Sequence, residues 1–300
     1  MDINFELPTN IDVEKIKADQ LDLVLSYPKT KELIKKQNIP LETVKKYLNY
    51  FVKVVKDDLS LHEDDSLLNK ELNGFISGIS YDKKSNTITQ TYAYIPKRAE
   101  LEKIKNKYLI REIEEDVFNY TLKDCLKHFR DERASLISKL ALIAKNGEAN
   151  KGIYIDGDAE TGKSFILAVF SKFLGKLDST TDLVFIDCNR EFEYAKNLYE
   201  KNRNQFDDYL VVLQKTQYLF IDDFGKEYKQ AFNFTNILIP VLEYRKEHNL
   251  LTFFTSSFRP TEIPSIYRYG KEMSDASKKL ARLILDLTEE CQLKGMKYYL

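Results

Sequence analysis

The segment GDAETGKS, residues 157–164, constrains this chain more than any other part of its sequence. It fits the pattern G-x-x-x-x-G-K-[ST] at every fixed position, and in that pattern glycines let the backbone wrap closely around phosphate oxygens. An apolar strand is expected directly before it, at 152–156, and an apolar helix directly after it, at 165–170. This context favours a phosphate-binding loop over a plain glycine turn. The predicted binding residues are Gly157, Asp158, Ala159, Glu160, Thr161, Gly162, Lys163, Ser164 and Phe165.

A second motif, YLFIDDFG at 218–225, predicts where the chemistry of a bound triphosphate takes place. Four apolar residues followed by two carboxylates put Asp222 at the C-terminal end of a strand, and ligands bind at that edge of an open α/β sheet. We expect the Lys163 ammonium to reach the β- and γ-phosphates, and the Ser164 hydroxyl to bind Mg²⁺. Asp222 is expected to hold the same ion through water, and Asp223 to orient or deprotonate the attacking water.

Three weaker candidates lie outside these two motifs. Thr255, Ser256 and Ser257 stand at the end of a predicted strand, where hydroxyls such as that of Ser257 could sense the γ-phosphate or simply cap the strand in solvent. Arg282 stands among apolar residues of a predicted helix, so it either pairs with a carboxylate or reaches a nucleotide. Glu227 is the next candidate for the base if Asp223 is not that group.

The second half of the chain alternates between strand and helix patterns. Short apolar segments stand at 152–156, 183–187, 218–222 and 251–255, with helical segments between them. Continuous apolar strands separated by helices predict an α/β fold, in which helices cover both faces of a parallel sheet.

The first half is mainly helical in its periodicity. Apolar residues recur at helical spacing in segments 12–25, 30–36 and 41–55. Segments 75–81 and 87–94, rich in β-branched and aromatic residues around a polar turn, predict a β-hairpin.

The domain boundary is expected near a charged segment that follows this hairpin. Residues 97–111 are predicted to form a solvated connecting helix or, alternatively, a basic arm that touches nucleic acid, and 122–144 a further helix. At roughly 100–200 residues per domain, we expect two domains, 1–110 and 111–300.

Composition excludes several classes of protein. The formal net charge of −1 excludes a uniformly basic nucleic-acid binder, although not a local basic groove. Three scattered cysteines without a C-x-x-C pair argue against a disulfide scaffold or a zinc knuckle. Without a run of 18 apolar residues or a signal-like N-terminus, the chain is predicted to be cytoplasmic and to have no membrane partner.

The order of these motifs resembles the ATPase half of bacterial helicase loaders of the DnaI/DnaC type, which are AAA+ ATPases. The segments that carry the resemblance are GIYIDGDAETGKS, VFIDCNREFEYAK, YLFIDDFGKE, FFTSSFRP, KLARLILDL and QLKG, spread over about residues 110–300. The resemblance implies an AAA+ P-loop domain that binds ATP and Mg²⁺, hydrolyses ATP slowly as a switch and self-assembles on ATP. It also implies two partners, the replicative DNA helicase, held by the N-terminal domain, and single-stranded DNA.

This sequence departs from the family pattern at several points. Longer loaders carry a zinc-binding set in the N-terminal domain, whereas residues 1–124 here hold no cysteine and a single histidine, so that zinc site is expected to be absent. Ser257 stands where the family commonly has Asn. Lys278 replaces the first of two arginines, so Arg282 alone is expected to act in trans, with Lys297 as a further basic sensor. The five residues after Gly295 leave no room for a C-terminal lid domain.

Three other functions are alternatives to a helicase loader, and each would need particular sequence features. A related transposition-helper ATPase would have a shorter and different N-terminal part. A small-molecule kinase would need an acceptor-binding lid and clustered arginines after the third strand. A non-hydrolysing scaffold that binds the helicase disagrees with the intact Lys163, Ser164, Asp222 and Asp223, although the substituted Ser257 keeps it open.

The segment after the second strand, 189–203, is a candidate contact for single-stranded DNA. The resemblance places it on the inner surface of an assembly, where its charges would touch DNA and its aromatic rings could stack on bases. Helical spacing of Phe192, Ala195 and Tyr199 favours an ordinary core face equally. If the segment does not bind DNA, the basic arm at 97–111 is the alternative. The basic residues are Arg190, Lys196, Lys201 and Arg203, and the other aromatic residue is Tyr194.

Overall fold

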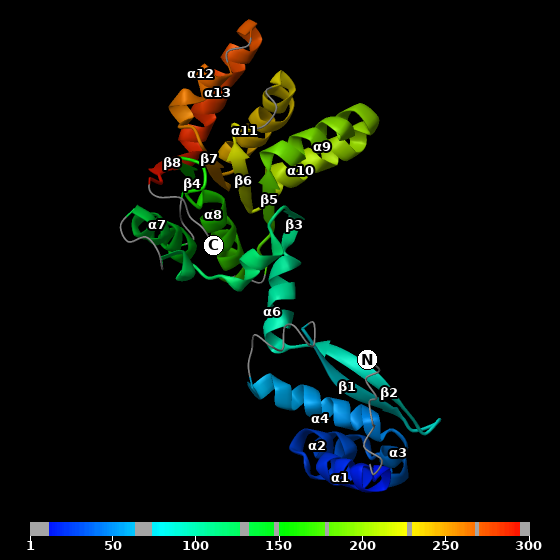
Figure 1. Ribbon diagram of the computed structural model, residues 1–300. Coiled ribbons are helices and arrows are strands. Elements are labelled where there is room, and N and C mark those ends of the chain that lie inside the picture. Colours follow the sequence, from blue (N-terminus) through cyan, green and yellow to red (C-terminus); the bar gives the residue numbers. More distant parts are fainter. Residues whose placement is uncertain are drawn as a thin grey trace, which may run out of the picture. The chain divides into compact units, whose positions relative to one another are not determined.

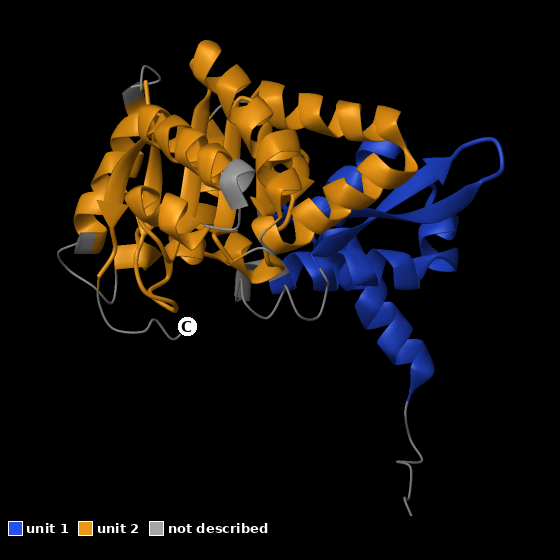
Figure 2. Cartoon of the chain, turned by 90° about the horizontal axis from the view of Figure 1, so that it is seen from above, with its two compact units in different colours: residues 1–100 blue, residues 101–300 orange. Residues whose placement is uncertain are grey.

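The computed structural model describes residues 12–63, 74–126, 132–146, 150–177, 180–226, 230–267 and 270–294. The chain divides into two compact units, residues 1–100 and 101–300 (Figure 2). The boundary expected at residue 110 therefore falls inside the second unit. Among the helices of the described ranges, none has the length and hydropathy needed to cross a membrane.

The first unit begins with helices, as the periodicity predicted (Figure 1). The Asp12 carboxylate accepts a hydrogen bond from the Lys15 N–H and so caps the first helix. The helix expected over 41–55 is instead two helices, because Tyr47 leaves helical geometry, with φ −110°. The four helices are α1 (Val13–Ser26), α2 (Pro28–Gln37), α3 (Leu41–Lys46) and α4 (Leu48–Glu63).

The predicted hairpin follows, as strands β1 (Phe75–Asp82) and β2 (Thr87–Tyr94) in antiparallel register. It is held to the helices by packing, since Ile79 and Ile88 join Val24, Val44 and Phe51 in one buried cluster. A buried carboxylate adds a polar tie: Asp57 of α4 accepts from the Ser77 N–H at 2.8 Å.

The second unit contains the predicted parallel sheet, with six strands in the order β3-β5-β6-β7-β4-β8. Four are the strands expected from the apolar segments, and the two edge strands were not predicted. The charged helix expected over 97–111 is wrong in its second half, because α6 (Pro96–Lys105) stops and the chain enters an edge strand. The strands are β3 (Tyr108–Arg111), β4 (Gly152–Asp156), β5 (Leu183–Asp187), β6 (Tyr218–Phe224), β7 (Leu251–Ser256) and β8 (Thr288–Gln292).

Helices cover both faces of this sheet, and successive strand residues point alternately into the hydrophobic cluster on one face and the cluster on the other. In β6, Phe220 packs with α7 (Glu132–Asn146) and α8 (Lys163–Leu177), whereas Leu219 and Ile221 pack in the cluster on the other face. The helices of that other face are α9 (Cys188–Lys201), α10 (Arg203–Lys215), the π-helical turn η3 (Asn233–Leu238), α11 (Ile239–Glu247), α12 (Ile263–Ile266) and α13 (Gly270–Leu287).

The helix expected over 122–144 is wrong in its first part. Short 3₁₀ turns, η1 (Glu115–Asn119) and η2 (Asp124–Leu126), precede it, and α7 is described from Glu132. The Asp124 carboxylate accepts from both the backbone N–H and the hydroxyl of Thr121, a local arrangement that competes with helix formation. A further 3₁₀ turn, η4 (Pro260–Glu262), follows β7.

Candidate nucleotide site

The phosphate-loop motif lies between β4 and α8, in the strand–loop–helix setting that the sequence predicted. Three of its residues have positive φ: Gly157 at 149°, Glu160 at 65° and Gly162 at 82°. Both motif glycines also stand in tight surroundings. A Cβ at Gly157 would lie 2.2 Å from the Leu293 carbonyl oxygen, and one at Gly162 would lie 3.1 Å from the Arg133 guanidinium. Glycine is therefore required at both positions.

The Lys163 ammonium is buried inside this loop, with 5% of the residue exposed. It donates to the carbonyl oxygens of Gly157, at 2.8 Å, and Asp158, at 2.6 Å. Burial lowers the pKa of Lys163, and the nearby Lys226 lowers it further, while the carboxylates around it oppose the shift. An ammonium has three donors, so the loop holds this group with one donor left for an anion such as a phosphate oxygen.

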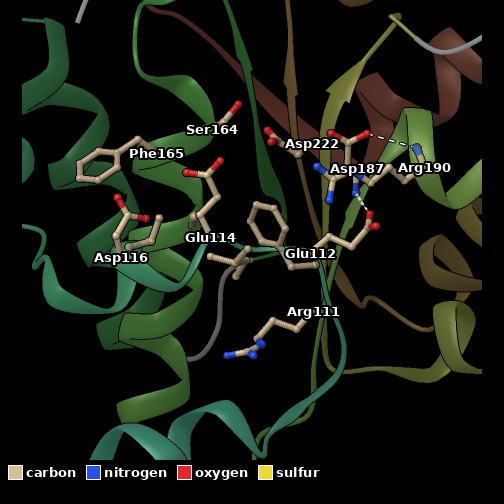
Figure 3. A pocket seen from close by; sticks show the side chains of 13 residues that line it. Arg111, Glu112, Glu114, Asp116, Ser164, Phe165, Asp187, Arg190 and Asp222 are labelled. Carbon is tan, nitrogen blue, oxygen red and sulfur yellow. Dashed lines mark hydrogen bonds between the residues drawn. The ribbon is translucent and has the colours of Figure 1, made fainter. Parts of the chain in front are cut away.

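Asp222 lies at the C-terminal end of β6 and faces the first turn of α8. Its carboxylate accepts a hydrogen bond from the Thr255 hydroxyl. Burial raises the pKa of Asp222 to about 6, and the carboxylates of Asp223 and Asp187 raise it as well, while the Ser164 and Thr255 hydroxyls lower it. Figure 3 shows the Ser164 and Asp222 oxygens turned toward each other.

This pair of oxygen donors fits Mg²⁺ in its chemistry. Mg²⁺ is bound by hard oxygen ligands, usually one or two protein groups together with water and substrate phosphates. The described residues contain no cluster of three or more His, Cys, Asp or Glu that could hold a metal without such help. A hydroxyl and a carboxylate beside a phosphate loop are thus enough for an ion that arrives with a nucleotide.

Asp223 has an unusual backbone conformation, with φ 54°. Its N–H donates to the Thr255 hydroxyl oxygen at 2.9 Å, and its carboxylate forms an ion pair with the Lys226 ammonium at 2.9 Å. The candidate base is therefore neutralised by a neighbouring cation in this state of the protein.

A pocket of about 510 Å³ opens beside Ser164 and Asp222 (Figure 3). Its size is that of a ligand pocket. Asp187 closes one side: its N–H donates to the Glu112 carboxylate at 2.7 Å, and its own carboxylate accepts from the Arg190 N–H. Because the lining comes from β3, η1, α8 and the ends of β5 and β6, no contiguous motif marked it. The charged lining residues are Arg111, Glu112, Glu114, Asp116, Asp187, Arg190 and Asp222.

Two of the weaker site candidates lie in the described part of the chain, and neither lines the pocket beside Ser164 and Asp222. Ser257 lies half-buried after β7, and its side chain makes no hydrogen bond within the described part of the chain. Arg282 is exposed on α13, and no carboxylate among the described residues forms an ion pair with it, so its role stays a prediction. Glu227 and Lys297 lie outside the described residues.

Two residues contact the site in ways that the sequence analysis did not predict. Arg133 of α7 is 3% exposed and donates to the Thr161 carbonyl of the phosphate loop. Thr255 of β7 is fully buried and contacts both Asp222 and Asp223. An arginine near a helix start carries no distinctive pattern, and although Thr255 stands at the end of a predicted strand, only the strand register places its hydroxyl at both Asp222 and Asp223.

The candidate DNA segment, 189–203, forms most of α9 and the start of α10. One face of α9 is buried, which bears on whether its aromatic residues belong to the core or stack on bases. Phe192 and Ala195 are core residues, as helical spacing suggested, whereas Tyr194 is 53% exposed. Tyr199 is 37% exposed but packs edge-on against Phe232, with ring centroids 4.9 Å apart. A polar pocket of about 390 Å³ lies on the same helix, lined by Asn189, Phe192, Glu193, Lys196, Asn197, Glu200, Gln230 and Asn233.

Comparison with known proteins gives one curated relative. The chain is 28% identical over 149 residues to the replicative helicase loader DnaI of Bacillus subtilis (strain 168), a match that covers 48% of this chain and 46% of that protein. The matched part thus spans about half of the relative's length. No model of a known protein family matches the chain.

Solved structures agree in fold. A crystal structure of DnaI aligns with a TM-score of 0.53 and 21% identity, covering 65% of this chain and 98% of that one. A candidate primosome component from Streptococcus pyogenes serotype M3 aligns with a TM-score of 0.50 and 20% identity, over 66% of this chain and 98% of that one. The resemblance seen in the motifs is therefore confirmed: the chain is similar in sequence to a replicative helicase loader, DnaI, and it shares the fold of the solved DnaI structure.

Proposed function

We propose that this chain is an ATP-dependent loader of the replicative DNA helicase onto single-stranded DNA. The observation that carries the proposal is the convergence of Lys163, Ser164 and Asp222 in a chain similar to a helicase loader. An ATPase switch without a helicase partner would explain the geometry but not the similarity.

Each residue of the site has a distinct role in the proposed reaction. The backbone of residues 157–162 and the Lys163 ammonium bind the triphosphate, and Ser164 and Asp222 hold the magnesium ion. When bound, Mg²⁺ neutralises charge on the β- and γ-phosphate oxygens. Asp223 orients or deprotonates the attacking water once its carboxylate leaves Lys226.

The proposed switch links this site to three partners. The first unit holds the helicase, and ATP occupancy favours self-assembly of the second unit and engagement of DNA. The exposed Arg282 reaches the nucleotide of a neighbouring copy. Lys196, Lys201 and Arg203, on α9 and α10, contact DNA phosphates, and hydrolysis releases the loader.

The experiment that tests the partner is co-purification of the full chain with the replicative helicase of the same organism. Residues 1–100 form a separate unit, so surface charge reversals placed there should abolish helicase binding while nucleotide binding persists. A non-hydrolysing scaffold would bind the helicase equally with ATP, ADP or no nucleotide. A transposition helper would not bind it at all, and that result would overturn the proposal.

A further inference from the structure

The pairing register between β6, which carries Asp222 and Asp223, and β7, which carries Thr255, shifts at the site. Ile221 of β6 is paired with Phe254 of β7, but the next pair is Phe224 with Ser256. Asp222 and Asp223 together therefore stand opposite the single residue Thr255. An extra residue of this kind is a β-bulge, a feature that bends a strand and turns a side chain in a new direction, often beside an active site.

The bulge has a cost that Thr255 offsets. Asp223 takes a left-handed conformation, with φ 54°, and its N–H loses its ladder partner. The Thr255 hydroxyl oxygen accepts from this N–H at 2.9 Å. A backbone N–H that loses its partner is destabilising, so this hydrogen bond stabilises the bulge.

The Thr255 hydroxyl also holds the carboxylate of Asp222 in place. A hydroxyl has a single proton, and because the Asp223 N–H is a donor, that proton is free for the Asp222 carboxylate. The structure places it there, as the Thr255 hydroxyl donates to Oδ1 of Asp222. Thr255 is fully buried, so water cannot readily replace this link.

We propose that Thr255 is a positioning residue that locks the bulge and thereby aims Asp222 at the Mg²⁺ site and Asp223 at the attacking water. This inference rests on the proposed ATPase function and gives Thr255 a role distinct from the γ-phosphate sensing expected of the strand-end hydroxyls. Ser257, by contrast, makes no side-chain hydrogen bond within the described residues and lies beyond the bulge.

Two substitutions separate the hydroxyl from the shape of the side chain. Thr255→Val keeps the size and branching but removes the donor and the acceptor. Thr255→Ser keeps the hydroxyl and loses a methyl group. Thr288→Val is the matched control, because Thr288 is also a buried threonine of the sheet, 4% exposed, and its hydroxyl donates to the Ile284 carbonyl oxygen at 2.6 Å, away from the acidic pair.

The test measures ATP hydrolysis and, separately, the affinity for a fluorescent ATP analogue with Mg²⁺ and with EDTA. We expect Thr255→Val to lower kcat by about 10–100-fold, the usual effect of removing a group that orients a metal ligand. The gain in nucleotide affinity on adding Mg²⁺ should shrink, while affinity in EDTA stays at the wild-type value. Thr255→Ser should restore most of both properties, and Thr288→Val should match wild type.

Several outcomes would overturn the inference. Wild-type kcat and wild-type Mg²⁺ dependence in Thr255→Val would do so, and so would a serine variant as impaired as the valine variant. If Thr255→Val does not fold, as judged by circular dichroism, Thr255→Ala is measured in its place against Thr255→Ser. Should the wild-type chain bind but not hydrolyse ATP, the proposed ATPase function fails, yet the Mg²⁺-dependent affinity still decides the role of Thr255.

Discussion

Arg133 offers a quantitative test of how the phosphate loop is held. Its guanidinium lies beneath the loop, donates to the Thr161 carbonyl and packs against Gly162, where any Cβ would lie 3.1 Å away. Arg133→Met keeps much of the aliphatic volume but removes the charge and the donors. We expect the loop to lose the conformation that binds phosphate, with the rest of the unit unchanged.

The size of the effect follows from the type of contact. A buried hydrogen bond from a charged donor contributes about 1.5–3 kcal/mol. Since every 1.4 kcal/mol is a factor of ten in affinity, the variant should bind ATP about 10–100-fold more weakly if the whole loss falls on the loop.

The assay is a titration with a fluorescent ATP analogue, accompanied by circular dichroism to establish folding. Lys139→Met is the matched control on the same helix, because Lys139 is half exposed and lies 3.6 Å from Glu289 in a surface ion pair that is worth about 0–1 kcal/mol. Wild-type affinity in a folded Arg133→Met variant would refute the idea that α7 holds the loop.

Three other substitutions test separate parts of the account. Asp223→Asn should keep ATP affinity and slow turnover in a hydrolysis assay. Unchanged turnover would show that another residue, and not Asp223, acts as the base. Arg245→Met should lower the free energy of unfolding of the second unit by about 3–5 kcal/mol in urea, because it leaves the carbonyl oxygens of Leu213, Thr216 and Leu251 without this buried donor, at about 1–3 kcal/mol each; a loss below 1 kcal/mol would contradict it. Replacing Lys196, Lys201 and Arg203 by Ala together should weaken binding of single-stranded DNA and reduce its log–log salt slope by about 2, measured by anisotropy, while ATP affinity stays the same. DNA binding equal to wild type would contradict this assignment and favour the basic arm at 97–111 as the DNA contact.

The sequence predicted those parts of the fold that local patterns determine. The phosphate loop needs fixed residues within eight positions, and strands β4, β5, β6 and β7 are continuous apolar runs, so both are readable without a structure. The edge strand β8 is TEECQ, and its exposed, acidic residues do not resemble a buried strand. It forms because Gly152 to Asp156 offer an unpaired edge for it, which is a property of the sheet and not of the segment.

The residues of the candidate site likewise divide into those that local motifs predict and those that only the fold brings together. Lys163, Ser164 and Asp222 come from motifs that predict their own geometry, and the structure brings them together. Thr255 and Arg133 act through contacts made by strand register and helix packing, which a single sequence does not encode locally. The expectation for Ser257 came from its place after a strand, but the strand register puts Thr255 opposite Asp222 and Asp223, and Ser257 lies beyond the last β6–β7 pair, Phe224 with Ser256.

The most direct test of the proposed loader is transfer of the replicative helicase onto covalently closed circular single-stranded DNA. The helicase is mixed with the DNA and the full chain, and helicase retained on DNA after gel filtration is quantified with ATP present. The account predicts retention that depends on both ATP and the wild-type chain, and that is lost with Lys163→Ala. Retention that is the same without the chain, or with Lys163→Ala in its place, would contradict the proposal that this protein is an ATP-dependent helicase loader.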